Sequence, residues 1–363
     1  MPACHQFLPT ASDGDAVFNF ALLLSRLLRE QGFASEIYAM EGQGRAAAEV
    51  RPYQEYAQHA APGHLLLYHF AIGSVLTEFL CGVPGRKILV YHNMTPPRYC
   101  KGADENTFRA ILWGQQQLRR LREVVELALG VSEFNRSDLE REFGFPRTGV
   151  LPLTADFEQL GRTSPDPRLL ARLEDGAANI LFVGKIAPHK CQDDLIKIFY
   201  LYHAHIEPCS RLVLVGSSRG ADAYDGYLRE LSAELGLKEA VLFLQGVSKE
   251  ELVACYRAAH LFLCMSEHEG VCVPLLESMY FRVPILSYAA AAVPETLGEA
   301  GVLLTRKEYH IAAETAHVLL ADEELRKHVI EGEARRIEAF ALPPLGERLK
   351  ALLDGLGYEG RYA

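Results

Sequence analysis

The sequence has no C-x-x-C pair, no excess of basic residues and no long uninterrupted hydrophobic run. Its eight cysteines are scattered, which argues against a zinc ribbon, a thioredoxin-like site or a disulfide framework. With 37 basic and 47 acidic residues the net charge is −10, so the chain has no overall attraction for nucleic acid. The most apolar window, 65–83, contains too many polar residues for a membrane span. No secretory signal is visible in residues 1–19, and we expect a cytoplasmic protein.

Short apolar runs alternate with amphipathic stretches along the 363 residues, a length that suits about two domains. Strands are expected at 3–8, 35–39, 65–69, 88–91, 127–131 and 149–151, and then at 180–183, 212–215, 241–244, 261–265 and 284–287. Helices are expected at 17–31, 105–126, 192–205, 224–235, 249–259, 273–281, 310–320 and 323–340. Continuous apolar strands joined by helical crossovers are typical of parallel sheets. The pattern therefore predicts an α/β protein with two doubly wound, Rossmann-like domains.

Residues 152–167 separate the two series and contain three prolines with little periodicity, which indicates an interdomain linker. We place the N-terminal domain at 1–155 and the C-terminal domain at 156–340. Ligands of such sheets bind at the carboxyl ends of the strands, so a cleft between the domains is the expected active site.

Two lysines flank a loop that follows the strand at 180–183. Lys185 and Lys190 lie five residues apart in the segment G-K-I-A-P-H-K, just before a predicted helix. Two cations near helix amides suit a diphosphate. The alternative is a pair of solvated surface lysines.

Two glutamates lie in the loop and helix that follow the strand at 261–265. In S-E-H-E-G-V-C-V-P-L-L-E-S, Gly270 permits close approach of the backbone and Pro274 suits the first turn of a helix. Amides of that turn can bind an anion. Glu269 and Glu277 would repel phosphate but can accept hydrogen bonds from sugar hydroxyls.

The spacing Glu269-x7-Glu277 resembles the hallmark of the retaining glycosyltransferases of family 4, the group 1 glycosyltransferases. Further matching segments follow in order at 184–190, 214–217, 235–237, 243–248, 293–296 and 300–301. The resemblance covers about 180–305. It implies the GT-B fold, in which two Rossmann-like domains face each other across a cleft and the C-terminal helix, within 341–363, returns to the N-terminal domain.

The resemblance also implies residue roles. Glu277 would hold the ribose hydroxyls, and Glu269 would bind a hydroxyl of the donor sugar. Lys185 and Lys190 would hold the diphosphate, and His92, after the strand at 88–91, would lie near the reacting centre. The implied catalytic set is His92, Glu269, Lys185 and Lys190. The implied donor-binding set is Gly14, Gly184, Val247, Gly270, Val271, Cys272, Val273 and Glu277.

Three positions depart from the family pattern. Lys185 replaces an arginine fork with a point charge. Cys191 stands where glycine is usual, which argues against a very tight turn there. Asp13-Gly14-Asp15 has one glycine where many members have two; it is formally a D-x-D metal motif, but its place before a helix favours Asp13 as the N-cap.

These observations predict a metal-independent retaining transferase that moves a sugar from a nucleoside-diphosphate donor, UDP-sugar in preference to GDP-sugar, to a hydroxyl acceptor. No cofactor, metal or nucleic acid is expected. The resemblance implies that the acceptor is a saccharide or a lipid-linked saccharide in bacterial polysaccharide or glycoconjugate synthesis. Arg119, Arg120 and Arg122 form a solvated helix face or, alternatively, a contact with anionic lipid at the cytoplasmic side of the membrane.

The alternative functions are a nucleotide-sugar 2-epimerase and a catalytically silent nucleotide-sugar-binding protein.

Overall fold

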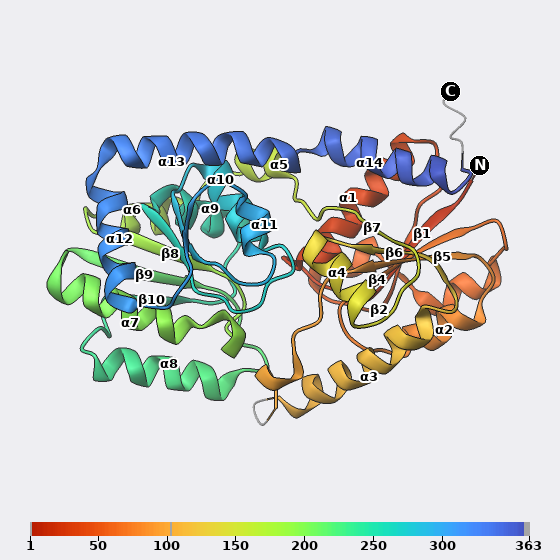
Figure 1. Cartoon of the computed structure of the whole chain (residues 1–363), viewed down its shortest axis with the longest axis horizontal. Helices are drawn as coiled ribbons and strands as arrows, with labels where there is room; N and C mark the ends of the chain where they lie inside the picture. The colour runs from red at the N-terminus through yellow and green to blue at the C-terminus, as the bar shows by residue number, and fades with distance from the viewer. Residues whose placement is uncertain (1, 102–103, 359–363) are drawn as a thin grey trace. The chain divides into compact units, whose positions relative to one another are not determined.

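The computed structural model describes residues 2–101 and 104–358, which fold into two compact units (Figure 1). The first unit comprises Met1–Pro97, Glu105–Ala155 and Phe340–Ala363, and the second comprises Arg98–Asp104 and Asp156–Ala339. Of the N-terminal domain expected from the sequence, residues 1, 102–103 and 359–363 lie outside the described residues.

The first unit is built on a seven-stranded parallel sheet with the order β3-β2-β1-β4-β5-β6-β7. Its strands are β1 (Cys4–Ala11), β2 (Ile37–Gly42), β3 (Arg51–Pro52), β4 (Leu65–Phe70), β5 (Arg86–Tyr91), β6 (Val125–Gly130) and β7 (Thr148–Val150). All six residues of β4 are buried, which explains why its sequence is a continuous apolar run. The strand order reverses between β1 and β4, and such a switch point is where open α/β sheets bind ligands.

Helix α1 (Ala16–Glu30) shows how the loop after β1 is organised. The carboxylate of Asp15 accepts a 2.8 Å hydrogen bond from the amide of Phe18 and is the N-cap. The prediction that Asp13 is the N-cap was therefore wrong. Asp13 instead accepts hydrogen bonds from the amides of Arg45 and Ala46, at the start of the 3-10 helix after β2. The other helices here are α2 (Leu76–Gly82), α3 (Glu105–Leu121) and α4 (Glu133–Arg141).

The second unit has a six-stranded parallel sheet with the order β10-β9-β8-β11-β12-β13. Its strands are β8 (Ala178–Val183), β9 (Ser210–Val215), β10 (Val241–Leu244), β11 (Leu261–Cys264), β12 (Ile285–Tyr288) and β13 (Val302–Leu304). Its helices are α5 (Phe157–Arg162), α6 (Pro167–Leu173), α7 (Gln192–His205), α8 (Asp222–Glu234), α9 (Lys249–Ala258), α10 (Val273–Phe281), α11 (Val293–Leu297), α12 (Tyr309–Ala321) and α13 (Glu323–Arg336). Figure 1 shows helices on both faces of this sheet, as doubly wound folds require.

The last helix, α14 (Leu342–Gly355), belongs to the first unit although it follows α13 of the second. The side-chain amide of Gln31, after α1, donates a 3.0 Å hydrogen bond to the carbonyl of Gly346. Leu345, Leu349 and Leu353 repeat every four residues and form the buried stripe of the helix. The expected return of the C-terminal helix to the N-terminal domain is confirmed.

Two segments differ from the sequence-based domain description. The expected linker, 152–167, contains helix α5, and the Phe157 ring stacks on Tyr280 of α10 at a centroid distance of 5.8 Å. Residues 152–156 and 163–166, on either side of α5, are irregular, and the aromatic contact attaches α5 to the second unit. Arg98–Asp104, placed by the sequence in the N-terminal domain, groups with the second unit. Tyr99 anchors it there through a 2.9 Å hydrogen bond to Glu267.

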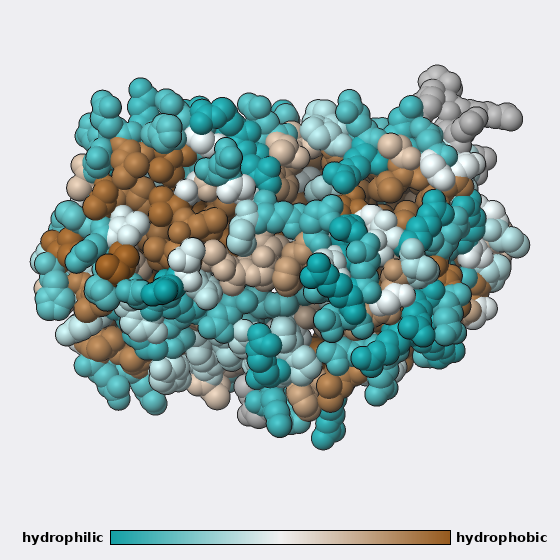
Figure 2. Space-filling view, in the orientation of Figure 1, coloured by the Kyte–Doolittle hydropathy of each residue, from teal (hydrophilic) through white to brown (hydrophobic). Residues whose placement is uncertain are grey.

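The visible surface is largely hydrophilic, with hydrophobic residues gathered over helix α12 and beside α13 (Figure 2). Ile311, Val318 and Leu325 are the exposed large hydrophobic residues on those two helices. Within the described part of the chain, every helix is too short or too polar to cross a bilayer.

Candidate functional site

The second sheet brings two loops together at its switch point. Strand order reverses between β8 and β11, whose carboxyl ends lie side by side. The loop after β8 carries the segment 184–190, and the loop after β11 carries 265–272. Gly184 opens the first loop so close to Gly216 that a Cβ on Gly216 would lie 1.9 Å from the Gly184 carbonyl oxygen. This topology explains why motifs about 80 residues apart form one site.

Lys190 and Glu269 form an ion pair between these loops. The ammonium Nζ lies 2.7 Å from the carboxylate Oε1, and the two side chains are only 17% and 7% exposed. Burial is the largest single influence and lowers the pKa of Lys190, but the charge and hydrogen bond of Glu269, together with Cys272 and Cys264, raise that pKa overall. Lys190 is therefore charged at neutral pH, and Glu269 is its partner in this buried pair.

Lys185 differs from Lys190 in its surroundings. Its side chain is exposed, whereas its backbone carbonyl accepts a 2.9 Å hydrogen bond from the side-chain amide of Gln192. The structure thus fixes the loop at Lys185 and leaves its ammonium group in solvent. The two lysines remain in one loop but are not equivalent cations.

The turn after Lys190 is tight, which corrects the expectation drawn from Cys191. Cys191 adopts the left-handed conformation with φ 53° and ψ 46°, which glycine adopts more readily than other residues. Its Sγ lies 3.2 Å from Nζ of Lys307 and 3.5 Å from the carbonyl oxygen of Pro188. These contacts hold a cysteine where the family usually has glycine, directly at the start of α7.

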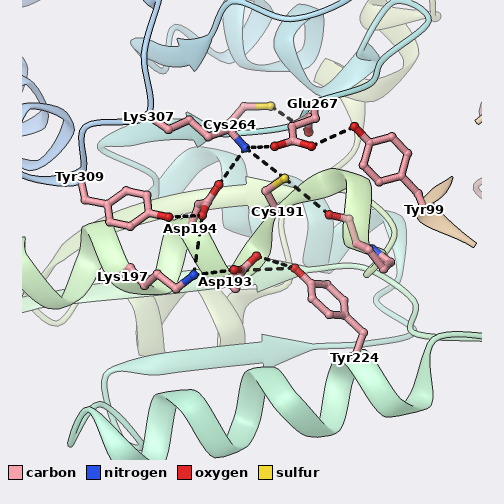
Figure 3. Close-up of polar contacts among 12 residues, drawn as sticks. Tyr99, Cys191, Asp193, Asp194, Lys197, Tyr224, Cys264, Glu267, Lys307 and Tyr309 are labelled. Carbon is pink, nitrogen blue, oxygen red and sulfur yellow. Dashed lines mark hydrogen bonds and ion pairs between the residues drawn. The ribbon is translucent and has the colours of Figure 1, made fainter. Parts of the chain in front are cut away.

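Lys307, after β13, ties the two loops to helix α7 (Figure 3). Its ammonium group lies 2.8 Å from Oδ2 of Asp194 in α7 and 2.9 Å from Oε1 of Glu267 in the loop after β11. Burial lowers the pKa of Lys307, but the hydrogen bonds to Asp194 and Glu267 raise it overall. The sequence analysis missed Lys307, because it lies 113 residues from Asp194 along the chain and outside the recognised segments.

The same network continues on both sides of Lys307 (Figure 3). Tyr309 donates a 2.6 Å hydrogen bond to Asp194, and Tyr99 donates a 2.9 Å hydrogen bond to Glu267. The hydrogen bond to Lys307 is the largest contribution that lowers the pKa of Glu267. The network therefore fixes Glu267 as an anion, two residues before Glu269.

Glu277 lies in the middle of α10 and is held by Tyr256 of α9. The Tyr256 hydroxyl donates a 2.6 Å hydrogen bond to Oε2 of Glu277, and Tyr256 is fully buried. Burial raises the pKa of Glu277, and the hydrogen bond from Tyr256 opposes that rise. Among the described residues no hydrogen bond occupies Oε1, so that oxygen remains an acceptor for a ligand. Tyr256 is a second residue that sequence reasoning missed.

Helix α10 begins at Val273, with Pro274 in its first turn and Cys272 as its left-handed N-cap. The first turn of a helix leaves its amides without intrahelical acceptors, so this end favours an anion. The predicted stretch Gly270–Val273 thus ends at a helix N-terminus. Val247 lies apart from it, in the loop between β10 and α9.

One group of side chains among the described residues has the spacing of metal ligands: Cys264, Glu269 and Cys272, whose ligand atoms lie within 4.8 Å of one another. Thiolates and a carboxylate suit zinc. In this structure, however, the ammonium of Lys190 lies 2.7 Å from Glu269, so the site already contains a cation. We therefore assign the carboxylate to Lys190.

Of the predicted residues of the first unit, Gly14 follows β1 at the switch point, and His92 follows β5, the strand next to β4. Gly14, with φ 78°, forms the turn between β1 and α1, and both flanking aspartates are engaged by backbone amides. His92 directly follows β5, and its Nε2 lies 2.8 Å from Nδ1 of His69 in β4. His69 was not predicted from the sequence.

The comparisons with known proteins agree with this geometry. Residues 171–336 match the family model "Glycosyl transferases group 1". The chain is 26% identical over 314 residues to O-antigen chain mannosyltransferase B of Escherichia coli, an alignment that covers 84% of this chain and 75% of the relative. It is 27% identical over 257 residues to the GDP-mannose-dependent alpha-(1-6)-phosphatidylinositol monomannoside mannosyltransferase of Mycolicibacterium smegmatis, covering 66% of this chain and 64% of the relative.

Solved structures extend the likeness to both units. Sucrose-phosphate synthase from Thermosynechococcus elongatus has a TM-score of 0.75 at 17% identity and covers 98% of this chain and 99% of its own. Anabaena Alr3699/HepE in complex with UDP-glucose has a TM-score of 0.74 at 16% identity and covers 97% and 99%. Residues 171–336 therefore resemble the group 1 glycosyltransferases, and the chain as a whole has the GT-B fold.

Proposed function

We propose that this glycosyltransferase moves a sugar from a nucleoside-diphosphate donor to a hydroxyl acceptor, with retention of the anomeric configuration and without a metal ion. The observation that carries the proposal is the buried Lys190–Glu269 pair at the β8/β11 switch point. It joins a cation suited to a diphosphate with a carboxylate suited to a sugar hydroxyl.

In this proposal the diphosphate lies against Lys190 and the first turn of α10, and Lys185 supplies further positive charge. Glu269 accepts a hydrogen bond from a hydroxyl of the donor sugar, and Glu277 accepts from the ribose hydroxyls. The free Oε1 of Glu277 and the fixed orientation of Oε2 by Tyr256 support the ribose role. Carboxylates are poor partners for phosphate. In this proposal the two glutamates therefore contact the sugar and the ribose, and the lysines and helix amides contact the diphosphate.

The chemical barrier in this mechanism is departure of the nucleoside diphosphate. The bond between the anomeric carbon and the phosphate oxygen breaks while the acceptor oxygen forms a bond to the same face of that carbon. The acceptor proton passes to the departing phosphate oxygen. Lys190 and the amides of α10 stabilise the negative charge that develops on the leaving group.

For the nucleotide, UDP is the first candidate and GDP the second. The O-antigen relative named a mannosyltransferase aligns over 84% of this chain, and another relative's name specifies GDP-mannose, which favours testing GDP-mannose directly. The acceptor class we propose is a saccharide or a lipid-linked saccharide in bacterial glycoconjugate synthesis. A lipid contact through the α3 arginines has less support, because Arg120 forms an ion pair with Glu78.

The test is a thermal-shift and calorimetric comparison of UDP, GDP and ADP with UDP-glucose and GDP-mannose, followed by turnover assays with excess EDTA. We expect one nucleotide diphosphate to bind and its sugar conjugate to be consumed, slowly by hydrolysis and faster with saccharide acceptors. Proton NMR of the product should show the donor's anomeric configuration.

Three outcomes would contradict the proposal. Inversion at carbon 2 without an acceptor would identify an epimerase. Binding without hydrolysis or transfer would identify a silent nucleotide-sugar-binding protein. Loss of turnover in EDTA that magnesium or manganese restores would refute metal independence.

A further inference from the structure

Three polar side chains form a hydrogen-bonded row across three adjacent strands of the first sheet. Gln6 of β1 lies opposite Leu67 of β4, and His69 lies opposite Val90 of β5. Because side chains two residues apart share a face, Gln6, His69 and His92 project from the same side of the sheet. Gln6 and His69 are fully buried, whereas His92 retains partial exposure.

The contact at the Gln6 end of this row determines which atom is the donor in each of its hydrogen bonds. The side-chain Nε2 of Gln6 lies 2.8 Å from the carbonyl oxygen of Ala21 in α1, and a carbonyl can only accept. The amide NH₂ of Gln6 therefore faces Ala21, and Oε1 of Gln6 faces His69. Oε1 lies 2.8 Å from Nε2 of His69, so that nitrogen carries a proton and donates it.

The protonation of His69 determines that of His92. Complete burial lowers the pKa of His69 to about 3, so its ring is neutral and its Nδ1 is an acceptor. Nδ1 of His69 lies 2.8 Å from Nε2 of His92, which must therefore donate. Burial lowers the pKa of His92 well below its ordinary value, so this ring is also neutral. Its remaining nitrogen, Nδ1, then has a lone pair and no proton.

The Nδ1 atom of His92 is buried and has no hydrogen-bond partner among the described residues. The Phe20 ring packs edge-on against both imidazoles, with centroids 6.0 and 6.3 Å away, and limits their rotation. A buried acceptor without a donor is unfavourable, because no hydrogen bond compensates for the water it has lost. A ligand that supplies an O–H or N–H group at this nitrogen would provide that hydrogen bond.

We propose that Gln6 and His69 are positioning residues that fix His92 as the Nε2–H tautomer, so that His92 accepts a hydrogen bond from a hydroxyl of the sugar substrate. The ligand class rests on the proposed function; the tautomer rests on the row alone. A bare nitrogen lone pair repels phosphate oxygens, so His92 contacts the sugar and not the diphosphate. With no proton at Nδ1, His92 also does not act as a general acid there.

The direct test is nitrogen-15 NMR of the full-length protein labelled at histidine, with the His92 signals assigned by their loss in His92→Gln. We expect Nδ1 of His92 to have the shift of an unprotonated ring nitrogen and Nε2 that of a protonated one. A protonated Nδ1 in the wild-type protein would overturn the proposal.

Gln6→Glu tests whether the row sets the tautomer. A buried carboxylate next to Nε2 stabilises a positively charged His69, which would then donate through both nitrogens. Nε2 of His92 would become the acceptor, and its proton would move to Nδ1. His69→Asn is the matched variant, because its side-chain oxygen can still accept from His92. An unchanged His92 spectrum in folded Gln6→Glu would contradict the coupling.

Ligand titrations test the hydroxyl contact separately. UDP-glucose or GDP-mannose, whichever binds by calorimetry, should shift Nδ1 of His92, whereas the matching nucleoside diphosphate alone should not. His69→Leu should lower turnover by up to about 100-fold while nucleotide affinity stays within about twofold, because the misplaced group acts on the sugar. His69→Asn should recover much of that loss. If the bound sugar conjugate left the Nδ1 signal of His92 unchanged, the ligand assignment would be overturned. If none of the nucleotides bound, the proposed function itself would be refuted instead.

Discussion

Lys190 and Glu269, 79 residues apart in the chain, form a 2.7 Å ion pair in which neither side chain is more than 17% exposed. A buried pair stabilises a fold weakly, because desolvation offsets most of the Coulomb attraction. Removal of one partner is costly, because the other charge is left buried. The pair is therefore better explained by a ligand that uses both groups than by stability.

Lys190→Met should destabilise the protein by about 3–5 kcal/mol, because the Glu269 carboxylate loses its buried counter-charge. Lys190→Met/Glu269→Gln should recover most of that stability but not nucleotide affinity. Urea unfolding and calorimetry with the best nucleoside diphosphate measure the two quantities. If the double variant bound the nucleotide as well as the wild type does, Lys190 would not contact the diphosphate.

Tyr256→Phe should weaken nucleotide binding by about 1 kcal/mol, because Glu277 loses the hydrogen bond that orients its carboxylate. Tyr68→Phe is the matched control: it removes a buried hydroxyl bonded to Ser74 and Thr77 in the first unit. Both variants should lose stability, but only Tyr256→Phe should lose affinity. Equal affinities would show that Tyr256 has only a structural role.

Cys191→Gly and Cys191→Ala separate backbone strain from side-chain contacts. Both remove the Sγ contacts, but only alanine retains a Cβ in the left-handed conformation at φ 53°. The glycine variant should therefore be more stable than the alanine variant by about 1 kcal/mol. Midpoints of chemical unfolding provide the comparison, and the reverse order would argue against this backbone conformation.

Glu333 in α13 should make the second unit less stable as pH rises. Its Oε1 accepts a 2.9 Å hydrogen bond from the amide of Ile285, its Oε2 is buried without a partner among the described residues, and burial raises its pKa from 4.5 to about 8. Between these values the unfolded chain has lost a proton that the folded protein keeps. Stability should fall by up to about 1.4 kcal/mol per pH unit and level off above pH 8.

Glu333→Gln should remove that slope, whereas Glu331→Gln, an exposed position on the same helix, should leave it unchanged. Urea unfolding of the three proteins between pH 5 and 9 gives the comparison. If the free energy of unfolding fell with pH at the same rate in all three proteins, Glu333 would already be ionised in the folded protein.

The helices whose ends carry strong local signals were predicted from the sequence. Val273–Phe281 matches the predicted helix, with Pro274 in its first turn, and Gln192–His205 matches as well. Helix α5 was missed because its six residues carry little periodicity and its position depends on the stacking of Phe157 on Tyr280. Strand β13 has only three residues, too few to stand out from its surroundings.

Local motifs likewise identified Lys190 and Glu269, because each lies in a recognisable segment after a buried strand. The network around Lys307 was not identified, because nothing local marks Lys307 as a partner of Cys191, 116 residues away. The row from Gln6 to His92 was hidden for the same reason, since strand register decides which polar side chains meet. The turn at Cys191 was predicted wrongly, because propensity alone does not include contacts that hold a non-glycine residue in a left-handed conformation.

The central claim is that the second unit binds a nucleoside diphosphate through Glu277 and Lys190. Calorimetric titration of UDP and GDP into the wild-type protein and into Glu277→Ala tests it most directly. We predict that the wild type binds at least one of them and that Glu277→Ala weakens that binding by about 1–3 kcal/mol, because hydrogen bonds to the ribose hydroxyls are lost. Equal affinity in the two proteins, or no binding by the wild type, would contradict the account.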